Sequence, residues 1–213
     1  MSQYFAPHPV NPEPRLIRRA VEIIRNGGVI AYPTDSCYAL GCHIGDKEAM
    51  ERIRRIRRVD ERHHFTLACR DLSEIAQYAK VDNVQYRLLR AHTPGSYTFI
   101  LRATRELPRR LAHPKRSTIG VRVPGHVVAH ALLEELREPL LSSTLILPDE
   151  SAPLTDPQEI RAKLEHALDL IIDGGYCGSE PTTVIDLSEG EPILVRAGKG
   201  DPAPFGFLTE SQI

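Results

Sequence analysis

The stretch P-L-L-S-S-T-L-I-L at residues 139–147 decides the fold class. It is bounded by prolines, and it lacks the alternation of polar and apolar residues found in strands that have one face in water. A strand buried on both faces needs helices on both sides of its sheet. Outward from it, helical periodicity at 126–137 follows S-T-I-G-V-R-V (117–123), a strand ended by Pro124. The centre of the chain is therefore predicted to be α/β.

The rest of the chain alternates between the same two periodicities. Strands are predicted at 29–33, 65–69, 97–103, 170–173, 182–187 and 192–196, with another inside the loop of residues 34–41. Helices are predicted at 14–26, 47–57, 72–79, 83–92 and 156–167. We predict one α/β domain at residues 14–200, with a large twisted mixed β-sheet flanked by helices, and terminal extensions at 1–13 and 201–213.

Composition is that of an ordinary globular chain, with 41% hydrophobic residues, 26% charged residues and a mean hydropathy of −0.27. No run of about 18 uncharged apolar residues is present, and the N-terminus has no basic region followed by an apolar one. We expect a cytoplasmic protein with no membrane partner. The four cysteines form no C-x-x-C pair, and H-V-V-A-H (126–130) lacks the glutamate of a zinc-protease helix, so no metal site is predicted.

Charge is unevenly distributed along the chain. Residues 51–70 carry a net charge of +4 and residues 102–122 a net charge of +6, whereas residues 132–170 carry −6. The basic residues are 22 arginines and 5 lysines, a composition suited to bidentate contacts with phosphate or carboxylate. A basic concave groove that binds a polyanion and a merely solvated charged face both fit this pattern.

Common catalytic signatures are absent. A-G-K-G (197–200) lacks the remaining residues of a phosphate-binding P-loop, and neither G-x-G-x-x-G nor G-x-S-x-G occurs. We therefore expect chemistry without a covalent protein nucleophile. Hydroxyl and guanidinium groups instead gather at strand ends and adjacent turns, where α/β sheets bind ligands. These are Thr34, Arg55, Arg57, Thr98, Arg122, Ser142, Ser143, Thr144, Thr182, Thr183 and Arg196, and they predict an anion-binding pocket.

Seven segments around these residues carry a family resemblance. In order they are P-T-D-S-C-Y-A-L-G (33–41), the pair Arg55 and Arg57, P-G-S-Y-T-F-I-L (94–101), T-I-G-V-R-V-P (118–124), S-S-T-L-I-L (142–147), T-T-V-I-D-L (182–187) and L-V-R-A-G (194–198). Over residues 14–198 the chain resembles the YrdC family of threonylcarbamoyl-AMP synthases, and within it the YciO branch.

The resemblance implies a reaction in which L-threonine, bicarbonate and ATP with Mg²⁺ give threonylcarbamoyl-adenylate and pyrophosphate, for the modification of adenosine in certain tRNAs. It implies that Arg55 and Arg57 hold the ATP phosphates and that Arg122 contacts the threonine carboxylate or carbamate. The remaining residues that it assigns to substrate and nucleotide binding are Thr34, Tyr38, Thr98, Ser142, Thr144, Thr182 and Arg196.

Two departures from the family pattern bear on activity. The family's K-x-R reads R-I-R (55–57), and its S-x-N reads Thr144-Leu145-Ile146, where a hydrocarbon replaces the amide. The alternative function is a non-catalytic protein that grips double-stranded RNA or tRNA by its phosphates. Its predicted contacts are Arg58, Arg109, Arg110, Lys115 and Arg116.

Overall fold

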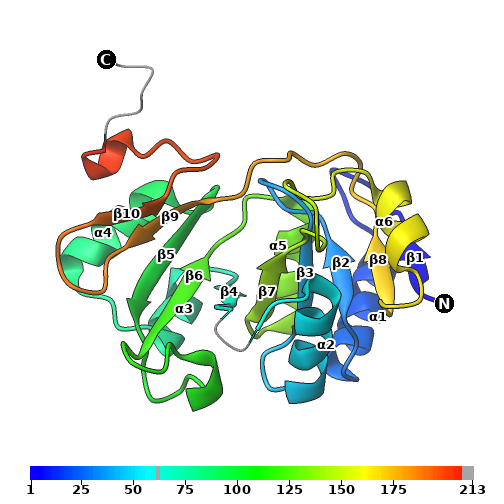
Figure 1. Ribbon diagram of the computed structural model, residues 1–213, viewed down its shortest axis with the longest axis horizontal. Coiled ribbons are helices and arrows are strands. Elements are labelled where there is room, and N and C mark those ends of the chain that lie inside the picture. Colours follow the sequence, from blue (N-terminus) through cyan, green and yellow to red (C-terminus); the bar gives the residue numbers. More distant parts are fainter. Residues whose placement is uncertain (61–62, 208–213) are drawn as a thin grey trace.

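Within residues 1–60 and 63–207, which this computed structural model describes, ten strands form one mixed sheet (Figure 1). Their order is β1-β8-β2-β3-β7-β4-β6-β5-β9-β10. The strands are β1 (Gln3–Phe5), β2 (Ile30–Tyr32), β3 (Ala39–His43), β4 (Thr66–Ala68), β5 (Tyr97–Arg102), β6 (Thr118–Arg122), β7 (Leu140–Thr144), β8 (Leu170–Ile172), β9 (Thr183–Asp186) and β10 (Ile193–Arg196). The predicted α/β class and large mixed sheet are confirmed.

Six α-helices and two short 3₁₀ helices accompany the sheet in the described part of the chain. They are α1 (Pro14–Arg25), α2 (Lys47–Arg57), α3 (Leu72–Tyr78), α4 (Asn83–His92), η1 (Arg109–Leu111), α5 (Val127–Leu136), α6 (Pro157–Leu164) and η2 (Ala203–Phe205). Acidic residues cap several of them: Asp46 accepts from the amide of Ala49 at the start of α2, and Asp156 precedes the proline that opens α6.

The structure differs from the predicted elements in several places. α6 ends at Leu164 instead of near 167, and Phe205 of η2, within the expected C-terminal extension, packs in the hydrophobic core. β7 ends at Thr144 instead of continuing to 147, although its residues are buried on both faces as predicted. The strand expected inside residues 34–41 begins later and reaches His43 as β3. Residues 3–5, which lie in the expected N-terminal extension, form β1 and pair in parallel with β8. Three residues are too few for periodicity to reveal a strand.

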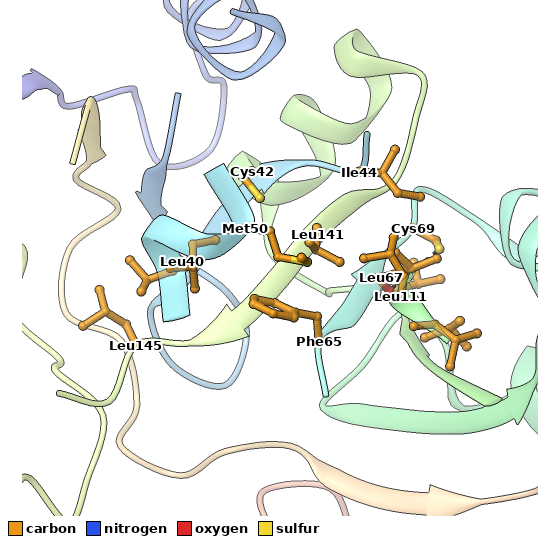
Figure 2. Close-up of a cluster of buried hydrophobic side chains, with 14 of the residues drawn as sticks. Leu40, Cys42, Ile44, Met50, Phe65, Leu67, Cys69, Leu111, Leu141 and Leu145 are labelled. Carbon is orange, nitrogen blue, oxygen red and sulfur yellow. Dashed lines mark hydrogen bonds between the residues drawn. The ribbon is translucent and has the colours of Figure 1, made fainter. Parts of the chain in front are cut away.

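Two hydrophobic clusters lie on opposite faces of the sheet. The first packs α2, α3, α4 and α6 against the strands, and Figure 2 shows part of it around Leu40, Met50 and Leu141. The second joins α1 and α5 to Ile30, Tyr32 and other residues of the strands between β8 and β4. None of the residues in this second cluster comes from β6, β5 or β9, and Thr98, Gly120 and Arg122 of the next section lie on the same face of the sheet.

Candidate functional site

A cavity of about 440 Å³ opens over the middle strands of the sheet. Strand alternation decides what lines it: Thr98 and Ile100 of β5 face the cavity, whereas Phe99 and Leu101 belong to the hydrophobic core. The volume lies within the range of about 300–1,000 Å³ typical of small-molecule sites. The pocket predicted at the strand ends therefore exists.

The floor of the cavity is one row of residues across adjacent strands. Thr66 of β4 pairs with Gly120 of β6, Gly120 pairs with Ile100 of β5, and Ile100 pairs with Asp186 of β9. A Cβ at Gly120 would lie 3.2 Å from Thr66 Oγ1 and 3.3 Å from the methyl group of Thr98. The glycine thus leaves open a space that any side chain would fill.

Arg122 ends β6 at the cavity wall and is 7% exposed. Its Nη2 donates to Asp35 Oδ1 at 2.5 Å, and its Nη1 donates to Ser36 Oγ at 3.3 Å. Asp35 Oδ2 also accepts from Ser96 Oγ at 2.8 Å. The Nε of Arg122 is buried and has no hydrogen-bond partner among the residues that the structure describes. A buried charged group with an unused donor is suited to an anionic ligand.

Arg57, at the last turn of α2, reaches the opposite wall of the cavity. Its Nη1 donates to Ser143 Oγ at 2.5 Å and to His63 Nε2 at 2.8 Å, while Ser143 Oγ lies 2.9 Å from the same histidine nitrogen. Burial, with the nearby positive charge of Arg196, lowers the pKa of the Arg57 guanidinium. A bound anion would offset the repulsion between the two arginines.

The third side of the cavity is built on paired hydroxyls. Thr98 Oγ1 and Thr182 Oγ1 are hydrogen-bonded at 2.8 Å, and the carbonyl of Thr182 accepts from Arg196 Nη2 at 2.9 Å. Thr34 lines the cavity from the turn after β2, where its Oγ1 accepts from the amide of Cys37 at 3.2 Å. Ser142 and Thr144 complete the hydroxyl rim from β7.

Three of the predicted site residues are placed elsewhere. Thr183 is fully buried in β9 outside the cavity lining, where its Oγ1 accepts from the amide of Gly198 at 3.0 Å. Tyr38 is fully buried in the core, where its hydroxyl donates to the carbonyl of Gly175 at 2.8 Å. It does not belong to the described residues that line the cavity. Arg55 is exposed on α2 and also lies outside that lining, because residues two apart on a helix point about 200° away from each other. Of the expected arginine pair, only Arg57 faces the cavity.

A second, basic groove of about 860 Å³ adjoins the cavity and shares its lining residues His63, His64 and His113. It contains three of the predicted RNA contacts, Arg109, Arg110 and Lys115, together with Lys47 and Arg54. The basic segments around residues 51–58 and 109–116 therefore meet in space, as the basic-groove prediction requires.

The other two predicted RNA contacts lie outside that groove. Arg116 instead lines the cavity, with its Nη1 3.6 Å from Asp186 Oδ2, and Arg58 lies at the surface within 3.7 Å of Asp149. Arg110 also supports the fold, since its Nη2 donates to the carbonyl of Gly45 at 2.6 Å.

Sequence reasoning missed His63, His113, Asp35 and Asp186 as site residues. The available signal was the pair His63-His64, two adjacent histidines directly before a predicted strand. The rings of His64 and His113 lie 4.7 Å apart where the cavity meets the groove. Burial and His113 lower the pKa of His64.

Side chains suited to a resident metal ion do not cluster in the described chain, where no group of three or more His, Cys, Asp or Glu residues has the required arrangement. Cys37 lines the cavity, but burial raises the pKa of its thiol. A protonated thiol is a poor nucleophile and a poor metal ligand. Among the described helices, none has the length and apolar character of a membrane span.

The fold and the cavity define a mixed-sheet α/β protein with a cavity lined by arginine and hydroxyl side chains. Residues 22–198 match the Sua5/YciO/YrdC family model, which carries the description "Telomere recombination". The chain belongs to this family. The resemblance expected from the sequence is confirmed.

Individual relatives agree with this placement. The uncharacterized protein YciO of Escherichia coli is 60% identical over 96% of this chain and 100% of its own, and the E. coli YciO crystal structure superposes with a TM-score of 0.93. The threonylcarbamoyl-AMP synthase of Chromobacterium violaceum is 34% identical over 91% of this chain and 100% of its own. Sua5 of P. abyssi in complex with L-threonine has a TM-score of 0.83 at 24% identity over 99% of this chain and 65% of its own, which shows a shared fold.

Proposed function

We propose that this protein is an L-threonylcarbamoyladenylate synthase acting in tRNA modification in the cytoplasm, with L-threonine, bicarbonate and ATP as substrates. One observation carries the proposal: Arg57, Arg122 and Arg196 present their guanidinium groups to a single cavity with a hydroxyl rim. The cavity belongs to a chain that is 34% identical to a threonylcarbamoyl-AMP synthase over that enzyme's whole length. In addition, the L-threonine complex of Sua5 is formed by a protein of the same fold.

The proposed reaction asks the protein mainly to position reactants and to neutralise charge. Bicarbonate takes up a proton and releases carbon dioxide and water, and the threonine amine adds to the carbon dioxide and loses a proton. The resulting carbamate oxygen attacks the α-phosphorus of ATP, and pyrophosphate leaves. Arg122, held in place by Asp35, would bind the threonine carboxylate or the carbamate. Arg57 and Arg196 would bind the triphosphate from opposite sides, and each charge-assisted contact contributes about 1.5–3 kcal/mol.

Mg²⁺ would enter as part of the ATP substrate. Magnesium keeps several waters and is usually held by one or two carboxylates with the substrate phosphates. Asp186 lines the cavity and is suited to this role, because its Oδ2 lies 3.6 Å from Arg116 Nη1 while its Oδ1 accepts from the amide of Ser188 at 2.8 Å.

Ile146 lowers the expected rate of the reaction. It lies just beyond β7 and lines the cavity, at the position where the family pattern has an amide. A hydrocarbon there donates and accepts no hydrogen bond, so it contributes nothing to the charge that develops on the triphosphate.

The test is incubation with radiolabelled bicarbonate, threonine and ATP with Mg²⁺, followed by chromatography of the adenylate. Arg57→Ala should weaken ATP binding in calorimetry by about 1.5–3 kcal/mol, the size of one charge-assisted contact. Arg18→Ala on the exposed side of α1 is the matched arginine control and should bind ATP as the parent does. Adenylate formation absent in the parent, or ATP affinity unchanged by Arg57→Ala, would contradict the proposal.

The basic groove supports a second candidate function, the gripping of double-stranded RNA or tRNA. Five basic side chains, Lys47, Arg54, Arg109, Arg110 and Lys115, line one concave surface. A-form RNA is recognised by shape through its phosphates and 2′-hydroxyls, so binding should show little sequence preference and should weaken steeply as salt rises.

Duplex RNA binding to Arg109→Glu with Arg110→Glu should be weaker than to the parent at low salt. Arg15→Glu with Arg18→Glu, which makes the same charge change on α1, is the control. The melting temperature of each variant is measured as well, because Arg110→Glu also removes the hydrogen bond from Arg110 to the carbonyl of Gly45 and could destabilise the fold. Equal RNA affinity of the two double variants would place the RNA elsewhere.

A further inference from the structure

One hydrogen-bonded cluster in the cavity contains a serine hydroxyl beside a histidine, a pair that the proposed adenylate formation does not use. Ser143 Oγ lies 2.9 Å from His63 Nε2, and Arg57 Nη1 lies 2.5 Å from the same hydroxyl. A serine hydroxyl within about 2.6–3.2 Å of a histidine nitrogen is the geometry of a nucleophile beside its base. The two residues are 80 positions apart in the chain, so sequence spacing does not reveal the pair.

The hydrogen bonds define the protonation state of the histidine. Arg57 can only donate, so His63 Nε2 accepts and its lone pair also faces the serine hydroxyl. Burial and the Arg57 charge lower the pKa of His63 to about 4, which keeps the ring neutral at physiological pH. The edge of the ring packs against Phe65, with the ring centroids 5.4 Å apart and the planes at 82°.

We propose that Ser143 and His63 form a nucleophile–base pair that transfers and hydrolyses acyl groups of substrates carrying a phosphate or carboxylate. This activity goes beyond the proposed synthase function, which uses no side-chain nucleophile. Ser143 is 6% exposed, and its open side is the cavity.

Each step balances without a further reagent. Ser143 Oγ attacks the acyl carbon, its proton passes to His63 Nε2, and the leaving group departs with that proton. Water then attacks the acyl-serine, and its proton passes through His63 back to Ser143 as the acid is released. Arg57 donates to the oxygen on which negative charge develops.

The surrounding charges select the substrate class. The positive charge of Arg57 opposes formation of a second positive charge on His63, which slows proton transfer for a neutral substrate. A phosphate or carboxylate bound between Arg57 and Arg196 offsets that charge and makes the imidazolium easier to form. The pair is therefore expected to act on anionic acyl substrates far better than on neutral ones.

The probes are the monosuccinate and the acetate ester of 4-nitrophenol, assayed by nitrophenolate release with the full-length protein. The rate without protein is subtracted for each ester. We expect the remaining, protein-catalysed rate to be at least tenfold higher for the succinate ester than for the acetate ester. Mass spectrometry of the quenched protein should find a succinyl group on the peptide that contains Ser143. Ser143→Ala should lose both the catalysed hydrolysis and the adduct.

His63→Gln distinguishes a histidine that acts as the base from one that only holds Arg57 and Ser143 in place. Glutamine can still accept a hydrogen bond but cannot take up the serine proton. It should slow hydrolysis at least tenfold while its melting temperature stays near that of the parent. Ser73→Ala on α3 and His166→Gln at the surface are the matched serine and histidine controls and should hydrolyse both esters at the parent rate.

Hydrolysis unchanged in a folded Ser143→Ala protein, an adduct on another residue, or equal rates for the two esters would overturn the proposal. Failure of the synthase proposal has a separate signature, since adenylate formation is measured with ATP and bicarbonate and does not involve the ester probes.

Discussion

Asp35 is the residue whose loss should most disturb the candidate site, because it balances the buried charge of Arg122. Only 14% of the Asp35 side chain and 9% of the Arg122 side chain are exposed. Replacing Asp35 with alanine removes the acceptor for Arg122 Nη2 and for Ser96 Oγ. Within residues 1–60 and 63–207, Arg122 Nε already has no hydrogen-bond partner. Asp35→Ala therefore leaves a buried charge uncompensated.

Removal of one partner of a buried ion pair costs about 3–5 kcal/mol of unfolding free energy. For a domain of this size, each kcal/mol lowers the melting temperature by about 2–4 °C, so the expected loss is roughly 6–20 °C. The matched control is Glu189→Ala. It breaks the Arg102–Glu189 pair, whose side chains are 54% and 59% exposed, and should cost less than about 1 kcal/mol.

Urea and thermal unfolding of the two variants measure this difference directly. Addition of Arg122→Met to Asp35→Ala removes the stranded charge, so the double variant should be more stable than Asp35→Ala alone. If Asp35→Ala costs no more than Glu189→Ala, or if the second change destabilises the protein further, the reasoning that Asp35 compensates a buried guanidinium is refuted.

Three further variants test the cavity. Gly120→Val should fill the floor between Thr66 and Thr98, abolishing ATP binding in calorimetry while costing about 1–3 kcal/mol of stability from overpacking; retained ATP affinity would contradict the position of the site. Ile146→Asn should raise adenylate formation per folded molecule more than it raises ATP affinity, since an amide there acts on developing charge; a stable variant with parental activity would exclude this residue as the limit. His63→Gln should make stability less sensitive to acid between pH 6.5 and about 4, because the parent's unfolded histidine binds a proton in that window and the folded one does not; unfolding curves of equal steepness with pH would contradict a neutral buried His63.

The sheet was predictable because its strands differ from the helices in period and length. β5, β6 and β9 lie within one or two residues of their predicted bounds, since each is an apolar run ended by a turn or proline. β7 was predicted three residues too long at its end, because Leu145 remains fully buried after the strand stops and continues the apolar pattern. At this end of β7 the side chains remain buried after the strand pairing stops, and the pattern of apolar residues in the sequence indicates burial but not strand pairing.

Strand alternation accounts for the placement of several predicted site residues, although Thr183 of β9 lies outside the cavity lining. Thr98, Arg122 and Ser142 lie at strand positions where alternation fixes which side they face. Arg55 and Arg57 are two positions apart in the sequence. In a strand this spacing would place both side chains on one face, but in helix α2 it places them on different faces. A family motif that is matched as a linear sequence pattern does not show whether its residues lie on a strand or on a helix, and so does not show which of them face the cavity.

Tyr38 and Ser143 show why proximity in sequence to a motif is a weak guide to the cavity. Tyr38 lies within four residues of Thr34, yet its hydroxyl is satisfied in the core by the backbone of Gly174 and Gly175, where it accepts from one amide and donates to one carbonyl. Ser143 reaches the reactive cluster because it alternates with Ser142, whose hydroxyl bonds Tyr32 on the other side. Both serines line the cavity but contact different partners, Ser142 the hydroxyl of Tyr32 and Ser143 the side chains of Arg57 and His63. The cavity lies beyond the strands that α1 and α5 cover, and the pleat of β7 turns Ser142 and Ser143 toward different parts of its wall.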